Sequence, residues 1–386
     1  MVEALQASRR DTLATFAAYE QVLPGLLAPQ RDGINPPLWE LGHVGWLQEF
    51  WLARNLVRNQ GSAADPDVPR TPAIRRNADA LYNSSEVLHD TRWSLPLPDA
   101  DRTRVDLAQH LAGTLALLRD AGDAAADTLY FFRLTLLHED MHHEAALYLA
   151  QALGIAVDDA RWQATPLPAP PPLALGPGRW LLGSVVGPGF AFDNELCMHA
   201  VELADVLIDA QVVRWAEFMP FVECGGYADD RWWSAAGRHW RSAQDTATPR
   251  YLRRDGTAWQ HWRHGHWWPL NLAEAACHLT HYEAGAWCRW AGRRLPTEAE
   301  WECAAVSRPE VFRWGDVWEW TASPFQPFAG FRPHPYRDYS APWFDGRPVL
   351  RGASHLTQPR MRHPRYRNFF PPYRNDVPAG FRSCVQ

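Results

Sequence analysis

The first 160 residues repeat hydrophobic and polar positions with the period of an α-helix. Four long segments show this period, at 9–26, 36–58, 104–120 and 124–153. Pro36 and Pro37 stand where the first turn of a helix tolerates proline. Gly154 follows the last segment, where helices commonly end. Four helices of this length predict a helical bundle.

The pattern changes beyond Gly178, where short apolar segments alternate with glycines, aromatic residues and turn signals. Helix-like stretches interrupt it at 214–224 and 283–290. These features predict a loop-rich α+β domain. The run from Thr165, Thr-Pro-Leu-Pro-Ala-Pro-Pro-Pro-Leu, is typical of a semi-rigid connector. The predicted organisation is a bundle at 1–160, a connector at 161–177 and an α+β domain at 178–386.

Composition narrows the possible functions. The 386 residues are enough for two domains, and a net charge of −6 without any basic run argues against a nucleic-acid partner. The sequence has neither a secretory h-region nor an apolar stretch long enough to span a membrane, so we expect a cytoplasmic protein. The six cysteines lack CxxC spacing, which argues against a zinc ribbon or a disulfide framework.

The strongest chemical signal is a pair of histidines, His138 and His142, on one predicted helix. Residues four apart project from the same helix face, so the two imidazoles can bind one metal ion. Glu144 lies about 200° around the helix from His142 and cannot join them. His43 is the best candidate for a third ligand, because it falls in the stripe that the second helix would turn inward. This stripe also contains Trp39, Trp46 and Phe50.

Each of these histidines alone could be a core residue held by hydrogen bonds. Three together favour a metal site with open coordination positions. Structural zinc is normally closed by four protein ligands, so an open site indicates catalysis. Imidazole ligands suit zinc, copper, iron and nickel, and the ligand type therefore leaves the metal undecided.

Seven short motifs occur in the second half. In chain order they are Phe192-Asp-Asn-Glu195, Gly225-Gly-Tyr227, Trp232-Trp-Ser234, Trp290-Ala-Gly-Arg-Arg-Leu-Pro-Thr-Glu-Ala-Glu-Trp301, Gly315-Asp-Val-Trp-Glu-Trp-Thr321, Val349-Leu-Arg-Gly352 and Ala379-Gly-Phe-Arg382. Together they resemble the domain shared by formylglycine-generating enzymes and ergothioneine sulfoxide synthases, a variant of the C-type lectin fold. Formylglycine-generating enzymes bind copper through a cysteine pair in the segment that corresponds to Ser354–Tyr366. This segment contains no cysteine here, so we do not expect that activity.

The first half resembles the DinB-like bundle that precedes this domain in the sulfoxide synthases. There, a His-x-x-x-His-x-Glu pattern and an upstream histidine bind a mononuclear non-haem iron. The matching positions here are His138, His142 and Glu144, with His43 upstream. The resemblance implies iron(II) held by the same three histidines that the spacing selects. It also implies an oxidoreductase that uses dioxygen to join sulfur or selenium to the imidazole of hercynine, the trimethylated betaine of histidine.

By resemblance, the proton-donating tyrosine lies in Pro335–Ser340, which leaves Tyr336 and Tyr339 as alternatives, and either could instead be structural. We expect hercynine in an aromatic and polar cleft between the two domains, where aromatic faces would attract its fixed cation. The family segments that approach it correspond to Asn368, Phe369, Phe370 and Arg382.

Three departures from the mycobacterial-type synthases concern the substrates. This chain has Met141 in place of a glutamine that contacts the imidazole, and Phe369-Phe370 in place of Trp-Asp. The arginine pair that binds the donor carboxylates is reduced to Arg92 in the segment Tyr82–Trp93. Unpaired donor carboxylates are costly to desolvate, so a neutral sugar-borne donor fits better.

The segments His89-Asp-Thr-Arg-Trp93 and His138-Glu-Asp-Met-His142 look similar to those of selenoneine synthases, which use hercynine and a selenosugar. We therefore predict formation of a C–Se bond, with His89 and Arg92 at the donor site. Three alternatives stay open: a C–S-forming synthase that takes cysteine or γ-glutamyl-cysteine, a zinc-dependent thiol transferase, and a non-catalytic ligand-binding protein. His89, Asp90 and Arg92 could equally form a network that ties a loop to the bundle.

Overall fold

The computed structural model describes residues 1–30, 33–122, 128–157, 170–185, 187, 189–263 and 265–385. These residues form two compact units. The first unit comprises those of Met1–Asp158 and of two later segments, Gly187–Phe190 and His334–Asp338. The second comprises those of Asp159–Val186, Ala191–Pro333 and Tyr339–Gln386. Tyr336 therefore belongs to the same unit as the three histidines.

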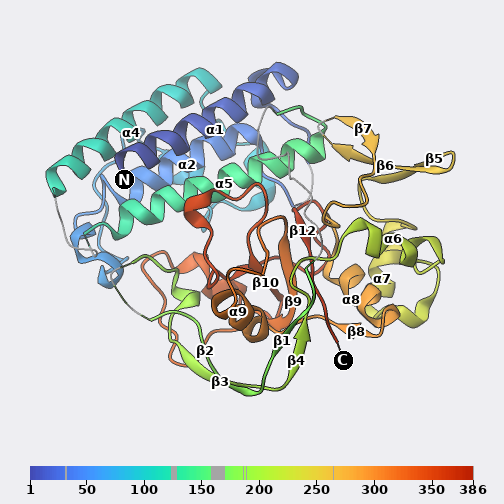
Figure 1. Ribbon diagram of the computed structural model, residues 1–386. Helices are drawn as coiled ribbons and strands as arrows, with labels where there is room; N and C mark the ends of the chain where they lie inside the picture. Colours follow the sequence, from blue (N-terminus) through green and yellow to red (C-terminus); the bar gives the residue numbers. More distant parts are fainter. Residues whose placement is uncertain are drawn as a thin grey trace. The chain divides into compact units, whose positions relative to one another are not determined.

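The first unit is a helical bundle (Figure 1). Its long helices are α1 (Val2–Val22), α2 (Pro37–Trp51), α4 (Ala100–Ala121) and α5 (Tyr130–Leu153). The short helix α3 (Ala78–Tyr82) and the 3-10 turn η3 (His89–Trp93) lie between α2 and α4 in the sequence. Helix α1 packs against α5, and α2 packs against both α4 and α5. Every residue of α2 except Phe50 is buried, which makes α2 the central helix of the bundle.

The four predicted helices are present, with shifted ends. Helix α1 begins at Val2 rather than at position 9, because Leu5 and Ser8 also face the core. Helix α2 ends at Trp51 rather than at position 58, and the chain beyond it places the Arg54 guanidinium on the Asp79 carboxylate. The hydrophobic periodicity of the sequence contains no information on this ion pair, so the predicted helix was too long.

The other two helices begin and end with recognisable caps. Asp99 accepts a hydrogen bond from the backbone N–H of Arg102 and starts α4 at Ala100, earlier than predicted. Helix α5 ends at Leu153, and Gly154 adopts the left-handed conformation with φ of 72°. The first residues of the predicted fourth helix, 124–127, lie outside the described residues.

The described residues of the second unit form sheets and four α-helices, as expected for an α+β domain. Its helices are α6 (Trp215–Glu223), α7 (Ala235–Gln244), α8 (His281–Trp290) and α9 (Glu298–Ser307). Thr280 and Thr297 cap α8 and α9, and each pairs with the glutamate three residues later. The run Leu-Pro-Thr-Glu-Ala-Glu-Trp, which ends at Trp301, therefore contains the start of α9.

The described residues of this unit form four sheets, with strand orders β1-β4-β13-β8, β11-β10-β9-β12, β2-β3 and β5-β6-β7. The strands are β1 (Leu173–Leu175), β2 (Gly178–Leu182), β3 (His199–Leu203), β4 (Val206–Ile208), β5 (Leu252–Asp255), β6 (Ala258–Arg263), β7 (His266–Pro269), β8 (Arg293–Arg294), β9 (Trp318–Pro324), β10 (Pro348–Gly352), β11 (Asn368–Phe369), β12 (Ala379–Gly380) and β13 (Cys384–Val385). Strand β1 lies within the range predicted as connector, because it pairs antiparallel with β4. Residues 161–169 of that connector lie outside the described residues.

Buried ion pairs join motifs that are far apart in the sequence. The pairs are Arg351 with Glu302, Arg367 with Glu298 at 2.9 Å, and Arg382 with Glu319 at 2.7 Å. The Arg382 side chain is fully buried and also donates to two backbone carbonyls. Breaking one partner of such a pair strands a buried charge, so the pairs hold α9 and β9 to the C-terminal segments. The predicted contact of Arg382 with a substrate does not agree with this core position.

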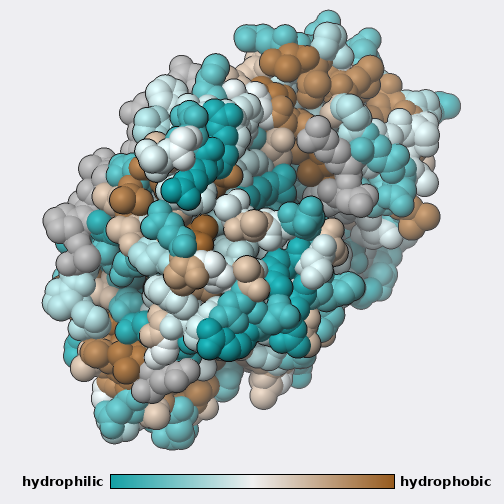
Figure 2. Space-filling view, turned by 90° about the vertical axis from the view of Figure 1, so that its right-hand side faces the viewer, coloured by the Kyte–Doolittle hydropathy of each residue, from teal (hydrophilic) through white to brown (hydrophobic). Residues whose placement is uncertain are grey.

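No helix within the described residues is both long enough and apolar enough to cross a membrane. On the face shown in Figure 2, hydrophobic residues gather in separate groups among hydrophilic ones.

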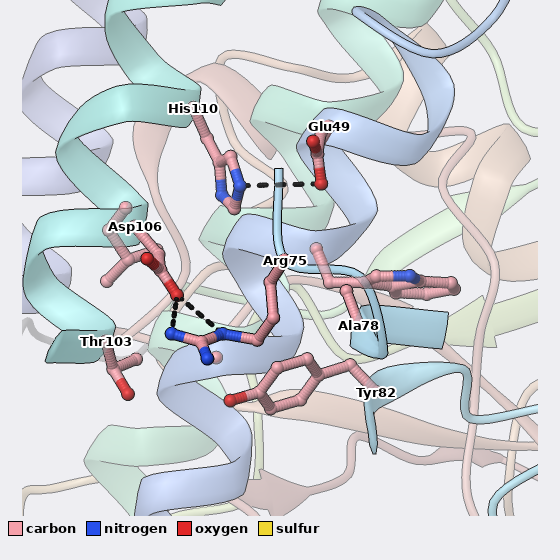
Figure 3. Close-up of a pocket in the computed structure, with 10 residues that line it drawn as sticks. Glu49, Arg75, Ala78, Tyr82, Thr103, Asp106 and His110 are labelled. Atoms are coloured by element: carbon pink, nitrogen blue, oxygen red, sulfur yellow. Dashed lines mark hydrogen bonds and ion pairs between the residues drawn. The ribbon is translucent and has the colours of Figure 1, made fainter. Parts of the chain in front are cut away.

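A small cavity of about 10 Å³ lies between α2, α3 and α4, beside several polar side chains (Figure 3). Arg75 donates to Asp106 at 2.7 and 2.9 Å beside it, and His110 faces Glu49 at 3.5 Å. The buried Tyr82 ring lies against Gly42 of α2. A Cβ added at Gly42 would come within 2.4 Å of the Tyr82 ring carbons. The missing side chain therefore lets Tyr82 approach α2 next to His43.

We expect Gly42→Ala to lower the free energy of unfolding by about 1–3 kcal/mol, because the added methyl overpacks a buried contact. Gly113→Ala in α4 is the matched control, since a Cβ there meets nothing within 4 Å. That change should raise stability by about 0.5–1 kcal/mol. Urea unfolding of both variants measures the difference, and equal effects of the two changes would contradict this packing.

Candidate metal centre

Three histidines from two packed helices meet inside the bundle. His43 comes from α2, while His138 and His142 come from one face of α5. Their possible ligand atoms all lie within 4.8 Å of one another, and their ring centroids are 4.2 to 5.2 Å apart. No other group of three histidine, cysteine or carboxylate side chains in the described part of the chain meets this distance. The structure thus brings together the three residues that the spacing selected.

Hydrogen bonds orient two of the three imidazoles. His43 Nδ1 donates to the backbone carbonyl of Tyr82 at 2.8 Å, and His142 Nδ1 donates to Glu40 Oε1 at 2.8 Å. We assign the proton to Nδ1 in both rings because a carbonyl and an ionised carboxylate can only accept. This assignment leaves each Nε2 lone pair free. Histidines that bind metals are commonly held in this way by a carbonyl or a carboxylate.

His138 differs from the other two because neither of its ring nitrogens has a hydrogen-bond partner. Its side chain is only 2% exposed, so water does not replace the missing partner at the surface. A buried polar group without a partner costs about 1–3 kcal/mol. A metal ion bound to one ring nitrogen would remove much of this cost. The residues present therefore fit a metal ion with three imidazole ligands.

The electrostatics of the cluster also suit a cation. Burial and, to a smaller extent, the neighbouring His142 lower the pKa of His43 to about 3. Burial likewise holds the pKa of His138 well below its usual range. These two imidazoles are therefore neutral at physiological pH, which is the form that binds metals. Burial would raise the pKa of Glu40, but its interactions with His142, including the hydrogen bond, outweigh the effect of burial and lower that pKa.

Glu40 is the site residue that sequence reasoning missed. It precedes His43 by three residues, so both lie on the same part of α2. The available signal was a carboxylate within an otherwise apolar run that is buried on all sides. Glu144, which belongs to the family pattern, is buried in α5 but is not part of the cluster, as its angle on the helix indicated.

The two candidate tyrosines lie in different units. The Tyr336 ring is in the bundle unit, with its centroid 6.0 Å from that of His138. Tyr339 is in the second unit, where it stacks on Phe192 at 4.0 Å and its hydroxyl lies 2.8 Å from that of Tyr366. Burial, followed by the charge of Asp338, raises the pKa of Tyr336, so its hydroxyl keeps its proton at neutral pH.

A pocket of about 290 Å³ adjoins Tyr336 within the bundle unit. Its lining combines aromatic and polar side chains: Trp46, Phe50, Trp51, Pro66, Asp67, Asn83, Ser84, Ser85, Pro335, Tyr336, Arg337 and Asp338. Trp46 also stacks on His43 with centroids 5.6 Å apart, so the pocket borders the histidine cluster. The one guanidinium of the lining, Arg337, is paired with Asp67 at 3.1 Å. Loop residues such as Asp67 gave no periodic signal in the sequence.

The predicted donor residues do not line this pocket. His89 bonds to the carbonyl of Ile34 at 2.7 Å and to Asp90 at 3.1 Å. Arg92 is 9% exposed and donates to Asn35. These contacts agree with the alternative of a network that ties the loop to the bundle. Met141 is partly exposed on α5.

The predicted hercynine residues other than Arg382 lie on or next to β11 in the second unit. Phe369 stacks on Phe325 at 4.2 Å, and the Arg374 guanidinium lies 5.3 Å from the Phe370 ring centroid. The side-chain oxygen of Asn368 accepts a hydrogen bond from the backbone N–H of Phe369. All three side chains are half-buried. Their contact with a substrate stays a prediction.

Part of the second half of the chain matches a known protein family. Residues 162–316 match the family of sulfatase-modifying factor enzyme 1-like domains. The formylglycine-generating enzyme of Streptomyces coelicolor is 33% identical over 152 residues, which are 36% of this chain and 48% of that protein. This similarity is confined to part of the chain.

Other relatives span both halves of the chain. The hercynine oxygenase of Mycolicibacterium smegmatis is 31% identical over 405 residues, which cover 90% of each protein. That of Mycobacterium tuberculosis is 31% identical over 414 residues and covers 92% of each. The resemblance inferred from the motifs is thereby confirmed. Because the similarity extends over the helical bundle as well as the α+β domain, this chain belongs to the hercynine oxygenase family of enzymes.

Proposed function

We propose that this enzyme binds iron(II) through His43, His138 and His142 and uses dioxygen to form a carbon–chalcogen bond on hercynine. The cluster of three histidines, with the buried and unpartnered His138, carries the proposal, together with relatives that are named hercynine oxygenases. Three protein ligands leave coordination positions open, and iron(II) with open positions supplies the activation of dioxygen. All six cysteines are free thiols, which favours the cytoplasm as the place of action.

The residues of the chain have distinct tasks in this reaction. The Tyr82 carbonyl and the Glu40 carboxylate hold two of the imidazoles in place. The Tyr336 ring lies beside His138 and its hydroxyl keeps its proton, so we assign Tyr336 the role of proton donor. The substrates would reach the cluster through the pocket that adjoins Tyr336. Its aromatic residues Trp46, Phe50 and Trp51 suit the fixed cation of hercynine.

The proposed donor is a selenosugar with a selenol group. A C–Se bond would replace the imidazole C–H bond and the donor Se–H bond, and dioxygen would accept the electrons and protons that are released. The pocket lining carries two carboxylates, Asp67 and Asp338, against one guanidinium, Arg337. A donor with several carboxylates would be repelled there, and Arg337 is already paired. A neutral, hydroxyl-rich donor avoids this cost. The second candidate is C–S bond formation with cysteine or γ-glutamyl-cysteine, since the names of the relatives specify hercynine and leave the donor open.

We expect purified enzyme loaded anaerobically with iron(II) to hold about one ion per chain. His138→Ala should weaken iron binding by more than about 100-fold, since loss of an outer partner alone costs about 10–100-fold. His143→Gln is the control, because His143 is a buried neighbour on α5 that bonds to Thr15. It should keep the iron. Metal analysis after gel filtration measures both, and iron retained by His138→Ala would show that the ligands are misassigned.

Tyr336→Phe should lower kcat by about 10²–10⁴-fold, which is the usual contribution of a positioned acid, while iron binding stays unchanged. Tyr339→Phe removes the hydrogen bond to Tyr366 and should change kcat only a few-fold. Steady-state rates with saturating hercynine give the comparison. If the two variants lose activity equally, or Tyr339→Phe loses more, the assignment of Tyr336 fails.

In a mixture of a selenosugar and γ-glutamyl-cysteine, the enzyme should prefer the selenosugar in kcat/KM by about a hundredfold or more, because unpaired donor carboxylates cost a few kcal/mol. Mass spectrometry of the products from one reaction with hercynine and air gives this ratio directly. A preference for the sulfur peptide would make the enzyme a sulfoxide synthase.

A further inference from the structure

A continuous chain of hydrogen bonds leads from Arg92 to the proposed ligand His142. Arg92 Nη1 donates to Asn35 Oδ1, and Asn35 Nδ2 donates to Glu40 Oε2 at 3.0 Å. The other carboxylate oxygen of Glu40 accepts from His142 Nδ1 at 2.8 Å. Each link pairs one donor with one acceptor, so the Asn35 amide and both Glu40 oxygens have fixed roles. The chain therefore connects η3 to the proposed metal centre.

The Arg92 guanidinium makes two further contacts, one with a backbone carbonyl and one with an aromatic ring. Its Nη2 donates to the carbonyl of Val87 at 3.2 Å, and its central carbon lies 4.0 Å from the Trp39 ring centroid. Trp39 in turn stacks on His43 with centroids 4.6 Å apart. Arg92 thus contacts residues that support two of the three proposed ligands. It is buried and absent from the pocket lining, so its position does not suit a donor carboxylate.

Charge explains why an arginine stands at this position. Glu40 is a carboxylate with only 6% exposure, and an uncompensated charge at that depth is costly. Arg92 interacts with this carboxylate electrostatically and binds it through Asn35. An ionised carboxylate on Nδ1 in turn makes the His142 imidazole a stronger ligand and fixes its tautomer.

We propose that Arg92 is a positioning residue of the metal centre, which fixes Asn35 and Glu40 so that Glu40 orients His142. This inference rests on the proposed metal site. Loss of Arg92 leaves Asn35 and Glu40 free to move, and His142 then loses its fixed orientation. The arginine that remains in the donor motif thus serves the metal ligands, and the donor has to be bound by other residues.

The test compares Arg92→Gln with Arg54→Gln. Arg54 is a matched control because it is also buried, lies 5.4 Å from the Phe50 ring centroid and bonds to a carboxylate, Asp79. None of its hydrogen bonds leads to Glu40. The readouts are the iron(II) dissociation constant, the unfolding temperature and the ¹⁵N NMR signals of the His142 ring in the metal-free protein, which report its tautomer.

Both variants should unfold at a lower temperature than the wild type. Only Arg92→Gln should weaken iron binding by about 10–100-fold and change the Nδ1–H signal of His142. Asn35→Ala should reproduce both effects, and the double variant should be no worse than either single one, because the residues act in one chain. If Arg92→Gln does not fold, the iron binding and the His142 signal of Asn35→Ala test the proposal instead.

The proposal is wrong if Arg92→Gln weakens iron binding no more than Arg54→Gln does and leaves the His142 signal unchanged. Arg92 would then be a purely structural residue. Additive effects of Arg92→Gln and Asn35→Ala would likewise overturn the proposed chain. If the wild type binds no iron, the proposed function fails by itself. The NMR signals of the metal-free protein still decide whether Arg92 orients His142.

Discussion

A buried polar group must find a partner, and this requirement organises the centre of the bundle. Helix α2 is buried almost throughout, yet it carries Glu40, His43, Gln48 and Glu49. Each has a defined contact: Glu40 with Asn35 and His142, His43 with the Tyr82 carbonyl, Gln48 with Arg9, and Glu49 with the N–H of Ile74. His138 faces α2 with both ring nitrogens unpartnered. A metal ion shared with His43 and His142 is the partner that completes the arrangement.

In the second unit, the need of buried charges for a partner explains why motifs far apart in the sequence lie together. Glu298 and Glu302 belong to α9, but their arginines come from β10 and from the segment before β11. Glu319 of β9 is matched by Arg382 after β12. Each of these buried glutamates is thus neutralised by an arginine that lies further along the sequence. These arginines therefore support the fold and are not available to a substrate.

Much of the bundle could be predicted from the sequence, because the helical period and the i, i+4 spacing are local properties. They placed His138 and His142 on one face, and the apolar stripe of α2 selected His43. Glu40 was missed, because an acidic residue near a helix start is also typical of the exposed first turn. The donor roles expected for Arg92 and His89 came from a motif, and a motif does not show which side chains are buried.

The choice between Tyr336 and Tyr339 could not be made from the sequence either. Both stand in one short segment without a periodic pattern, and the boundary between the two units runs between them. Only the contacts of residues 334–338 with the bundle place Tyr336 beside His138. Long-range packing of this kind leaves no trace in local residue patterns.

X-ray absorption at the iron edge of the anaerobically loaded enzyme tests the central claim most directly. The account predicts imidazole scattering from three histidines, with oxygen atoms in the remaining positions. The chain has six free thiols that could compete for a metal ion. Sulfur scatterers at the iron, or fewer than two imidazoles, would contradict a centre built from His43, His138 and His142.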